Sequence, residues 1–275
     1  MATLLAPESR LCPPFSGFDQ LPLVLVISTS LALPFPGLAQ LAAEPLVTDR
    51  PDFTESAVTI APGRYQLESG YTFTRVGPER EHGVGEVLLR VGLTDRLELR
   101  LGAGSLLVRD DELAQRSGLD DTSIGVKLRI AEEGDRVGAG RPGIALLAGT
   151  TLPTGSGGFG ADVAQPGATL ALAWTLSDRV GVASNLGYVY ASDGGDRFDE
   201  FSGSVEVGYS LTERWGSYLE ASGFAVGDGG TDTGFLNGGV TYLFSPDLQV
   251  DARIGAGLNG VDPDYFVGVG IARRW

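Results

Sequence analysis

The chain ends on the stretch Tyr265-Phe-Val-Gly-Val-Gly-Ile-Ala-Arg-Arg-Trp275, in which apolar residues recur at every second position. Counting back from Trp275, and passing over the polar Arg273, the apolar set reads Ile271, Val269, Val267 and Tyr265. The intervening set is mostly small or polar and consists of Phe266, Gly268, Gly270, Ala272 and Arg274. Successive side chains of a β-strand point to opposite faces, so this period of two predicts a strand with one apolar face.

A strand of this kind that ends the chain on an aromatic residue resembles the closing strand of bacterial outer-membrane β-barrels. In such a barrel the apolar face meets lipid and the small or polar face meets the lumen. An edge strand of a soluble β-sandwich has the same period, so the choice between a barrel and a sandwich depends on the rest of the chain. Trp275 also resembles the terminal aromatic residue recognised during outer-membrane insertion, which makes the assembly machinery an expected partner.

The N-terminus predicts export. Residues Leu21 to Leu33 form an uncharged apolar run, which is followed by two prolines and by Gly37-Leu38-Ala39. The run is too short to span a bilayer as a helix, and small residues follow it, as in a secretory signal peptide. We expect residues 1–39 to be removed by cleavage after Ala39, with Ala42 and Ala43 as alternatives, and the rest to reach the cell outer membrane.

Composition excludes several classes of function. The one cysteine, Cys12, lies in the predicted signal peptide, so neither a disulfide nor a thiolate metal site is expected in the mature chain. The formal net charge of −15 argues against a nucleic-acid partner, because such binding depends on basic side chains at phosphates. No apolar stretch of 18 residues remains after the signal. A membrane form must therefore be a closed barrel, since only helices and barrels satisfy the backbone in lipid.

The remaining chain reads as about twelve strands with connections of two kinds. The expected strands cover residues 65–74, 86–93, 97–102, 122–130, 143–152, 168–176, 180–191, 201–211, 215–224, 234–244, 248–258 and 265–275. Every second connection is short, such as Thr94-Asp-Arg96, whereas most of the others are longer loops, including 77–82, 109–118 and 192–200. Outer-membrane barrels show this asymmetry, with short periplasmic turns and longer external loops. No such alternation of loop length is expected in a soluble β-sandwich. The predicted fold class is all-β, an antiparallel transmembrane up-and-down β-barrel of about 12 strands over residues 63–275.

Aromatic residues fall near the ends of the expected strands. The three tryptophans form a predicted periplasmic aromatic belt, Trp174, Trp215 and Trp275. A second set is expected at the opposite edge: Phe73, Tyr188, Tyr190, Phe201, Phe235 and Tyr265. Two aromatic belts around an aliphatic band fit the headgroup regions of a lipid bilayer, which is therefore the expected environment.

Four short motifs carry a resemblance to a known family. They are Thr48-Asp-Arg-Pro-Asp-Phe-Thr-Glu55, Gly118-Leu-Asp-Asp-Thr-Ser-Ile-Gly-Val-Lys127, Leu152-Pro-Thr-Gly155 and Ser184-Asn-Leu-Gly-Tyr188. In this order and spacing they resemble the outer-membrane β-barrel family labelled as phenol-degradation (meta-pathway) transporter proteins. The resemblance covers essentially the whole mature chain. It implies a barrel with a role in moving small molecules, with aromatic or hydrophobic compounds among the candidates, and it assigns no functional residues.

The positions expected to face the lumen carry charges of both signs. They are Glu68, Glu86, Glu98, Asp121, Glu206, Glu220 and Asp251 with Arg90, Arg100, Lys127, Arg129 and Arg253. Buried charges need partners, so one interpretation is a salt-bridged filling that stiffens the barrel. The other is a charged constriction that selects solutes. With about twelve strands the bore is intermediate between filled eight-stranded barrels and open sixteen-stranded porins, and we favour a narrow channel.

Residues 40–62 are predicted to be a periplasmic arm, because they lack alternation and contain Pro51 and Pro62. An extended chain of this length reaches ~60 Å, enough to enter the barrel from the periplasmic end. The side chains that it offers to the lumen are Asp49, Arg50, Asp52 and Glu55. We expect Arg50 to pair with Glu206 or Glu220; the alternative is a simple leader to the first strand.

Three functions remain open. The first is a monomeric, passive channel or transporter for a small-molecule solute. The second is a non-conducting structural or surface-interaction barrel with a plugged lumen. The third is a lipid-modifying barrel enzyme, which would need a nucleophile with a histidine base. The one histidine, His82, is expected in an external loop beside Glu81, so we expect no enzymatic activity, no cofactor and no metal site.

Overall fold

The computed structural model describes residues 45–111, 114–134, 140–227, 230–259 and 263–275. The predicted signal peptide and its cleavage site lie outside these residues. All the regular secondary structure in these described residues is β-strand. The same residues contain no helix that is long and apolar enough to cross a membrane.

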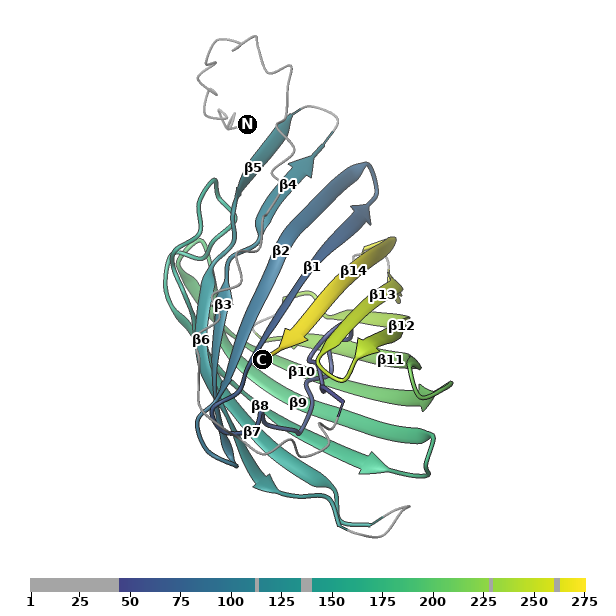
Figure 1. Ribbon diagram of the computed structural model, residues 1–275. Coiled ribbons are helices and arrows are strands. Elements are labelled where there is room, and N and C mark those ends of the chain that lie inside the picture. Colours follow the sequence, from purple (N-terminus) through teal and green to yellow (C-terminus); the bar gives the residue numbers. More distant parts are fainter. Residues whose placement is uncertain (1–44, 112–113, 135–139, 228–229, 260–262) are drawn as a thin grey trace, which may run out of the picture. The chain divides into compact units, whose positions relative to one another are not determined.

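Twelve strands close into an antiparallel barrel (Figure 1). β1 (Tyr65–Val76) pairs with β2 (Glu79–Gly92) on one side and with β14 (Tyr265–Arg274) on the other, which closes the sheet. Between β2 and β14 the wall follows the chain through β3 (Leu97–Ala103), β6 (Thr122–Ala131), β7 (Gly143–Leu152), β8 (Gln165–Thr175), β9 (Val180–Asp193), β10 (Asp196–Ser210), β11 (Trp215–Val226), β12 (Thr233–Ser245) and β13 (Leu248–Gly257). The predicted fold class, including the strand number, is confirmed.

Three predicted loops are largely strand. β4 (Leu106–Asp110) and β5 (Gln115–Leu119) form a hairpin over most of 109–118, and β4 pairs with the first half of β2. Only Gly77 and Pro78 join β1 to β2, and only Gly194 and Gly195 join β9 to β10. Hydropathy alternates where one face meets lipid, whereas backbone pairing continues beyond the lipid. Polar strand segments outside the membrane therefore have the composition of loops.

His82 is consequently in a different setting from the one predicted. It lies within β2 rather than in an external loop. Its Nδ1 is 2.9 Å from the hydroxyl of Tyr71, and its ring contacts that of Phe73 on the neighbouring strand.

The turns predicted to be short, at residues 94–96, 177–179 and 212–214, lie together at one end of the barrel, beyond which the strands do not extend. We call it the periplasmic end because short turns mark that side of outer-membrane barrels. The hydroxyl oxygens of Thr94, Ser177 and Thr212 each accept the N–H groups two and three residues later. Such bonds stabilise tight turns, which explains the recurrence of Ser or Thr at the first turn position. The pairing of β1 with β14 also ends there: Tyr65 and Trp275 exchange backbone hydrogen bonds, and the centroids of their stacked rings are 5.2 Å apart.

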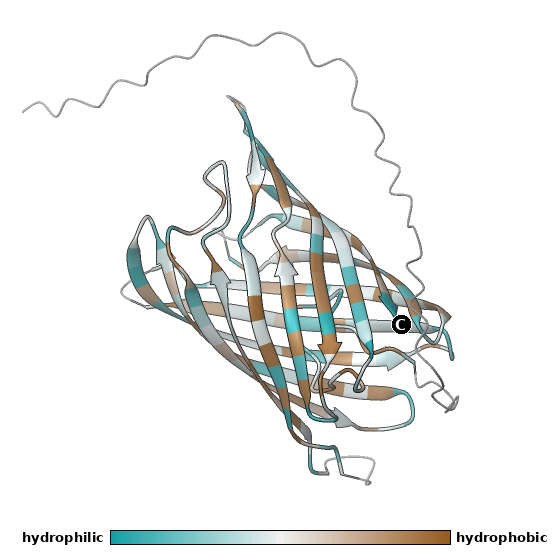
Figure 2. Ribbon diagram, turned by 60° about the vertical axis from the view of Figure 1, so that its left-hand side comes forward, coloured by the Kyte–Doolittle hydropathy of each residue, from teal (hydrophilic) through white to brown (hydrophobic). Residues whose placement is uncertain are grey.

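The outer face of the wall is apolar. On β13 and β14, Ile254, Val269 and Ile271 are among the most exposed large apolar side chains, whereas Phe266 and Ala272, which point to the opposite face of β14, are buried. Apolar and polar residues alternate along the strands in Figure 2. All three tryptophans lie at the periplasmic end: Trp174 near the end of β8, Trp215 at the start of β11, and Trp275 directly after β14.

The described part of the arm, residues 45–62, lies inside the barrel (purple in Figure 1). Its contacts reach strands on opposite sides of the wall, including β1 through Glu68 and β9 through Asn185. Glycines make room for it. A Cβ at Gly70 would collide with the guanidinium of Arg50, and one at Gly92 would collide with the backbone of residues 60 and 61.

Candidate functional site

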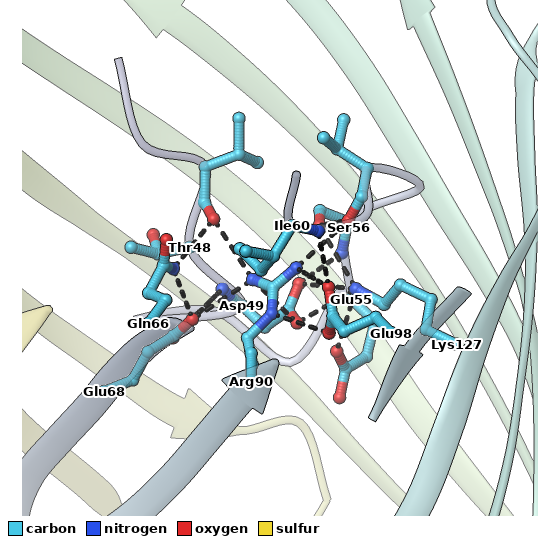
Figure 3. Close-up of polar contacts among 12 residues, drawn as sticks. Thr48, Asp49, Glu55, Ser56, Ile60, Gln66, Glu68, Arg90, Glu98 and Lys127 are labelled. Atoms are coloured by element: carbon cyan, nitrogen blue, oxygen red, sulfur yellow. Dashed lines mark hydrogen bonds and ion pairs between the residues drawn. The ribbon is translucent and has the colours of Figure 1, made fainter. Parts of the chain in front are cut away.

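On one side of the lumen the arm is held by charged side chains, which we call the β1–β6 ion cluster. It consists of Asp49 and Glu55 of the arm with Glu68, Arg90, Glu98, Arg100 and Lys127 of the wall. Arg90 lies at its centre (Figure 3). Its guanidinium donates to Glu98 at 2.8 Å and to Glu68 at 3.1 Å, and it lies 3.1 Å from the carboxylate of Asp49.

The other two cations of the cluster grip the arm directly. Arg100 contacts Asp49 at 2.5 Å and Glu55 at 2.8 Å, and Lys127 contacts Asp49 at 2.9 Å. The Ile60 N–H of the arm donates to Glu98 as well (Figure 3). Charges that are withdrawn from water need close partners of opposite sign, and each cation here has at least two. The sequence predicted the wall residues of this cluster but not their grouping.

The two arm carboxyls differ in their affinity for a proton. Burial opposes ionisation of Asp49, yet the neighbouring Arg90, Lys127 and Arg100 hold its pKa well below the usual range. Burial and the charge of Asp49 raise the pKa of Glu55 to about 7, against the opposing effect of Arg100. Asp49 is therefore the fixed anion of the arm, and Glu55 titrates near neutral pH.

On the opposite wall, Glu220 of β11 binds the backbone of the arm. Its two oxygens accept the Phe53 N–H at 3.0 and 3.1 Å, and one also accepts the Thr54 hydroxyl at 2.5 Å. Asn237 of β12 donates to the same carboxylate at 2.6 Å. These donors contact both carboxyl oxygens of Glu220 and tie the backbone of the arm to β11 and β12.

Two further contacts complete the crossing of the lumen. The hydroxyls of Thr54 and Ser204 are 2.7 Å apart. The Glu55 N–H donates to the side chain of Asn185, which donates in return to the Glu55 carbonyl. The arm thus reaches from the β1–β6 ion cluster to the wall formed by β9, β10 and β11.

The expected pairing of Arg50 with Glu206 or Glu220 is wrong. Its guanidinium contacts Glu86 at 2.5 Å and lies 3.7 Å from Asp251. Glu86 has a φ of +41° and follows a register shift in the β1–β2 pairing. Bulges change the direction in which a side chain points, and the hydropathy pattern does not predict a bulge at this position.

Three other predicted lumen residues have distinct settings. Arg253 donates to the Pro51 carbonyl of the arm and to Thr72 of β1. Arg129 instead bonds the Asp95 carbonyl at the periplasmic rim, away from the arm. Asp121 accepts three backbone N–H groups of the loop between β7 and β8, those of Thr154, Gly155 and Ala161.

An aromatic cluster in the lumen was not predicted. The Phe53 ring of the arm lies 5.8 Å from those of Phe235 and Phe266, and the Arg253 guanidinium lies 5.4 Å from Phe53 and 5.5 Å from Phe266. The assignment of Phe235 to the external belt is wrong, because Phe235 shares its face of β12 with Asn237, which is buried in the lumen. Counting by two along β12 would have revealed this.

Two cavities flank the arm. The external cavity, about 680 Å³, has Glu55 and Arg100 at its floor and Thr151, Gln165 and Glu200 near the outer strand ends. The periplasmic cavity, about 540 Å³, lies between the arm and strands β8 to β13, and its lining includes the turn Ser177–Arg179. A third cavity of about 330 Å³ adjoins the aromatic cluster. The contacts of Thr54 and Glu55 with the wall lie between the two larger cavities.

Among solved structures, the COG4313 outer membrane channel from Pseudomonas putida F1 is similar, with a TM-score of 0.63 at 14% identity over 80% of this chain and 98% of that chain. The KdgM porin gives a TM-score of 0.49 at 10% identity over 76% of this chain and 98% of that chain. At such identities the likeness to the first of these shows the fold alone. Comparison with curated proteins gives no match.

The family model described as "Putative MetA-pathway of phenol degradation" matches residues 48–275. That range starts in the arm motif Thr48–Glu55 and ends at the closing Trp275, so it includes the whole site described above. The resemblance inferred from the four motifs is confirmed, and the protein belongs to this phenol-degradation MetA-pathway family.

Proposed function

We propose that the protein is a monomeric channel of the cell outer membrane that passes small solutes along its arm-filled lumen. The closed transmembrane barrel supports this location, and one chain supplies the complete wall. Membership of the family supports a role in transport, as does the likeness to a protein described as an outer membrane channel. The signal peptide over residues 1–39 is part of the same proposal.

The observation that carries the proposal is the pair of large cavities separated by a thin barrier. The barrier is the Thr54–Ser204 contact together with the reciprocal bonds between Glu55 and Asn185. Each hydrogen bond contributes about 0.5–1.5 kcal/mol net, whereas breaking a buried ion pair costs about 3–5 kcal/mol. The Thr54–Ser204 contact and the backbone bonds of Glu55 to Asn185 are therefore the contacts that break most easily, while the carboxylates of Asp49 and Glu55 stay anchored in the β1–β6 ion cluster.

The aromatic cluster bears on the choice of solute. Phe53, Phe235 and Phe266 present ring faces and edges next to Arg253, beside a cavity of about 330 Å³. Aromatic contacts of this kind contribute about 0.5–1.5 kcal/mol each beyond burial. We therefore include small aromatic or hydrophobic compounds among the solutes.

A plugged, non-conducting barrel is the second candidate. It is favoured by the complete burial of Arg90, Lys127, Glu68 and Glu98 in the β1–β6 ion cluster, which holds the arm tightly. A lipid-modifying enzyme has less support, since the side-chain hydrogen bond of His82 in the described part of the chain is to the phenol of Tyr71 and not to a serine or cysteine.

Conductance of the refolded protein in planar bilayers tests the proposal. The full chain should pass a small current, and deletion of residues 40–60 should raise the conductance several-fold while heat-modifiable gel mobility is retained. A variant with residues 40–60 in scrambled order is the matched control, because it keeps length and composition but not the contacts. A silent full-length protein with a conducting deletion variant would favour the plugged barrel, and silence of both would overturn the channel.

A further inference from the structure

The two sides of the lumen differ in how their charges are balanced. The β1–β6 ion cluster pairs its carboxylates with three cations. On the opposite side Asp52 of the arm meets Glu206 and Glu220, which are directly cross-strand neighbours on β10 and β11. Within the described part of the chain, no ion pair links any of these three carboxyls to a basic side chain.

Glu220 is held by hydrogen bonds to the arm and to Asn237, whereas no other described residue donates a hydrogen bond to the half-buried carboxyls of Asp52 and Glu206. Both carboxyls line the periplasmic cavity. Burial and the neighbouring Glu206 raise the pKa of Asp52 well above the usual range. Two carboxylates that share a cavity and repel each other are stabilised by a positive partner or a shared proton.

A buried hydroxyl lines the same cavity. Tyr218 of β11 is only 9% exposed, and its hydroxyl has no hydrogen-bond partner in the structure. Asp52, Glu220 and Glu206 all lie close enough to act on that hydroxyl electrostatically. Buried polar atoms are almost always paired, so the unpaired hydroxyl in a cavity lined by two carboxyls indicates a missing hydrogen-bond partner.

The residues that line the cavity indicate what kind of ligand group would fit it. The described residues contain no group of three or more His, Cys, Asp or Glu arranged to hold a metal ion. An ammonium group offers three N–H donors and a positive charge, which matches two carboxyl groups and a hydroxyl. The rest of the lining includes Leu46, Ala57, Ala173 and Ala183, which accommodate a short carbon chain.

We propose that the periplasmic cavity binds a small organic cation, whose ammonium group contacts Asp52, Glu206 and Tyr218 and whose carbon chain lies against the apolar lining. This goes beyond the proposed function, because a non-conducting barrel would hold the same ligand. Of the other charged groups in or near the cavity, Arg50 is held by Glu86, Glu220 by the arm, and Nη1 and Nη2 of Arg253 by Pro51 and Thr72. Asp178 and Arg179 lie exposed at the periplasmic mouth.

Isothermal titration of the refolded full-length protein with n-butylammonium tests the site without any measurement of current. Saturable binding is expected at pH 7.5 and none with n-butanol, which has a similar chain and no charge. Binding should weaken towards pH 5, because the proton on the Asp52–Glu206 pair then competes with the ligand. Glu206→Gln and Tyr218→Phe should each weaken it at least ten-fold. Glu200→Gln, on the same strand but at the external cavity, is the matched control and should bind as the wild type does.

Heat-modifiable gel mobility establishes that each variant is folded. Undiminished binding to Glu206→Gln, or equal binding of n-butanol, would overturn the site. No binding of n-butylammonium to the folded wild type would also overturn it and would assign the carboxyl pair to a shared proton. Equally tight binding of K⁺ would overturn the assignment to an organic cation. None of these outcomes depends on whether the barrel conducts, so the two proposals fail separately.

Discussion

At the scale of single residues, Arg90 shows how strongly the lumen depends on one buried charge. Its guanidinium is inaccessible to solvent and contacts the carboxylates of Glu68, Glu98 and Asp49. It also donates to the arm carbonyls of Val47 and Val58. One side chain therefore joins strands β1, β2 and β3 to two separate points of the arm.

Replacing Arg90 with alanine should lower the free energy of unfolding by about 3–5 kcal/mol, because it leaves buried carboxylates without their cation. Urea titration of the barrel in detergent measures this. Arg129→Ala is the matched control: that side chain bonds Asp95 and Glu132 at the periplasmic rim, and its loss should cost under about 1 kcal/mol. Equal effects of the two substitutions would show that the cluster does not stabilise the barrel.

Docking of the arm should depend on pH through Glu55. The pKa of Glu55 is about 7 in the docked arm, above the value of 4.5 for an ordinary glutamate, so the docked state binds the proton more tightly. This contribution is complete below about pH 4.5 and is lost as the pH rises through 7. The raised pKa of Asp52 acts in the same direction, whereas the lowered pKa of Asp49 weakens docking only in strong acid.

A nitroxide label on the arm should accordingly become more mobile between pH 5 and pH 8. In Glu55→Gln the change should shrink but persist, because Asp52 still titrates. A mobility that does not change with pH in the wild type would contradict this assignment.

At the scale of strands, the predictions held where lipid constrains the sequence. The alternation in β14 follows from one face in lipid and one in the lumen, and the count of twelve strands followed from the same rule. The same rule did not predict the hairpin of β4 and β5, because that hairpin lies outside the lipid-facing part of the wall, where hydropathy need not alternate. Several of the charges predicted for the lumen, such as Arg90 and Glu98, are buried inside the barrel, but the partners of the lumen charges depend on a bulge at Glu86 and on the path of the arm. Neither is encoded in local periodicity, which is why the partner of Arg50 was predicted wrongly.

Alternate residues of β10 face the lipid, so a charge introduced at one of them should lower the stability of the barrel. Val205 is among the more exposed apolar side chains near the middle of that strand. Val205→Arg should destabilise the barrel in lipid by about 2–4 kcal/mol, since a cation near the bilayer midplane loses its hydration. Leu211→Arg, in a periplasmic turn, is the control and should change stability little. A nitroxide at position 205 that reports water rather than lipid would show that the strand faces are reversed.

At the scale of the whole molecule, wall and arm have separate roles. The closed sheet sets the diameter of the lumen and satisfies its own backbone in the membrane. The arm sets the free cross-section, because it is anchored at Asp49 and meets the far wall at Thr54. On the proposed function, the passage is closed where Thr54 contacts Ser204 and opens when that contact is lost.

A reversible covalent lock at this contact tests whether the passage runs there. The two hydroxyls are 2.7 Å apart, so cysteines in the double variant Thr54→Cys, Ser204→Cys should be close enough for a disulfide. The one natural cysteine, Cys12, precedes the predicted cleavage site, so no other thiol is expected to compete in the mature protein. Oxidation should abolish the conductance of the double variant, and a reductant should restore it, whereas the single variant Thr54→Cys should respond to neither. Full conductance of the oxidised double variant would mean that solutes cross the barrel without displacing the arm at Thr54, and the gate would have to lie elsewhere along the arm.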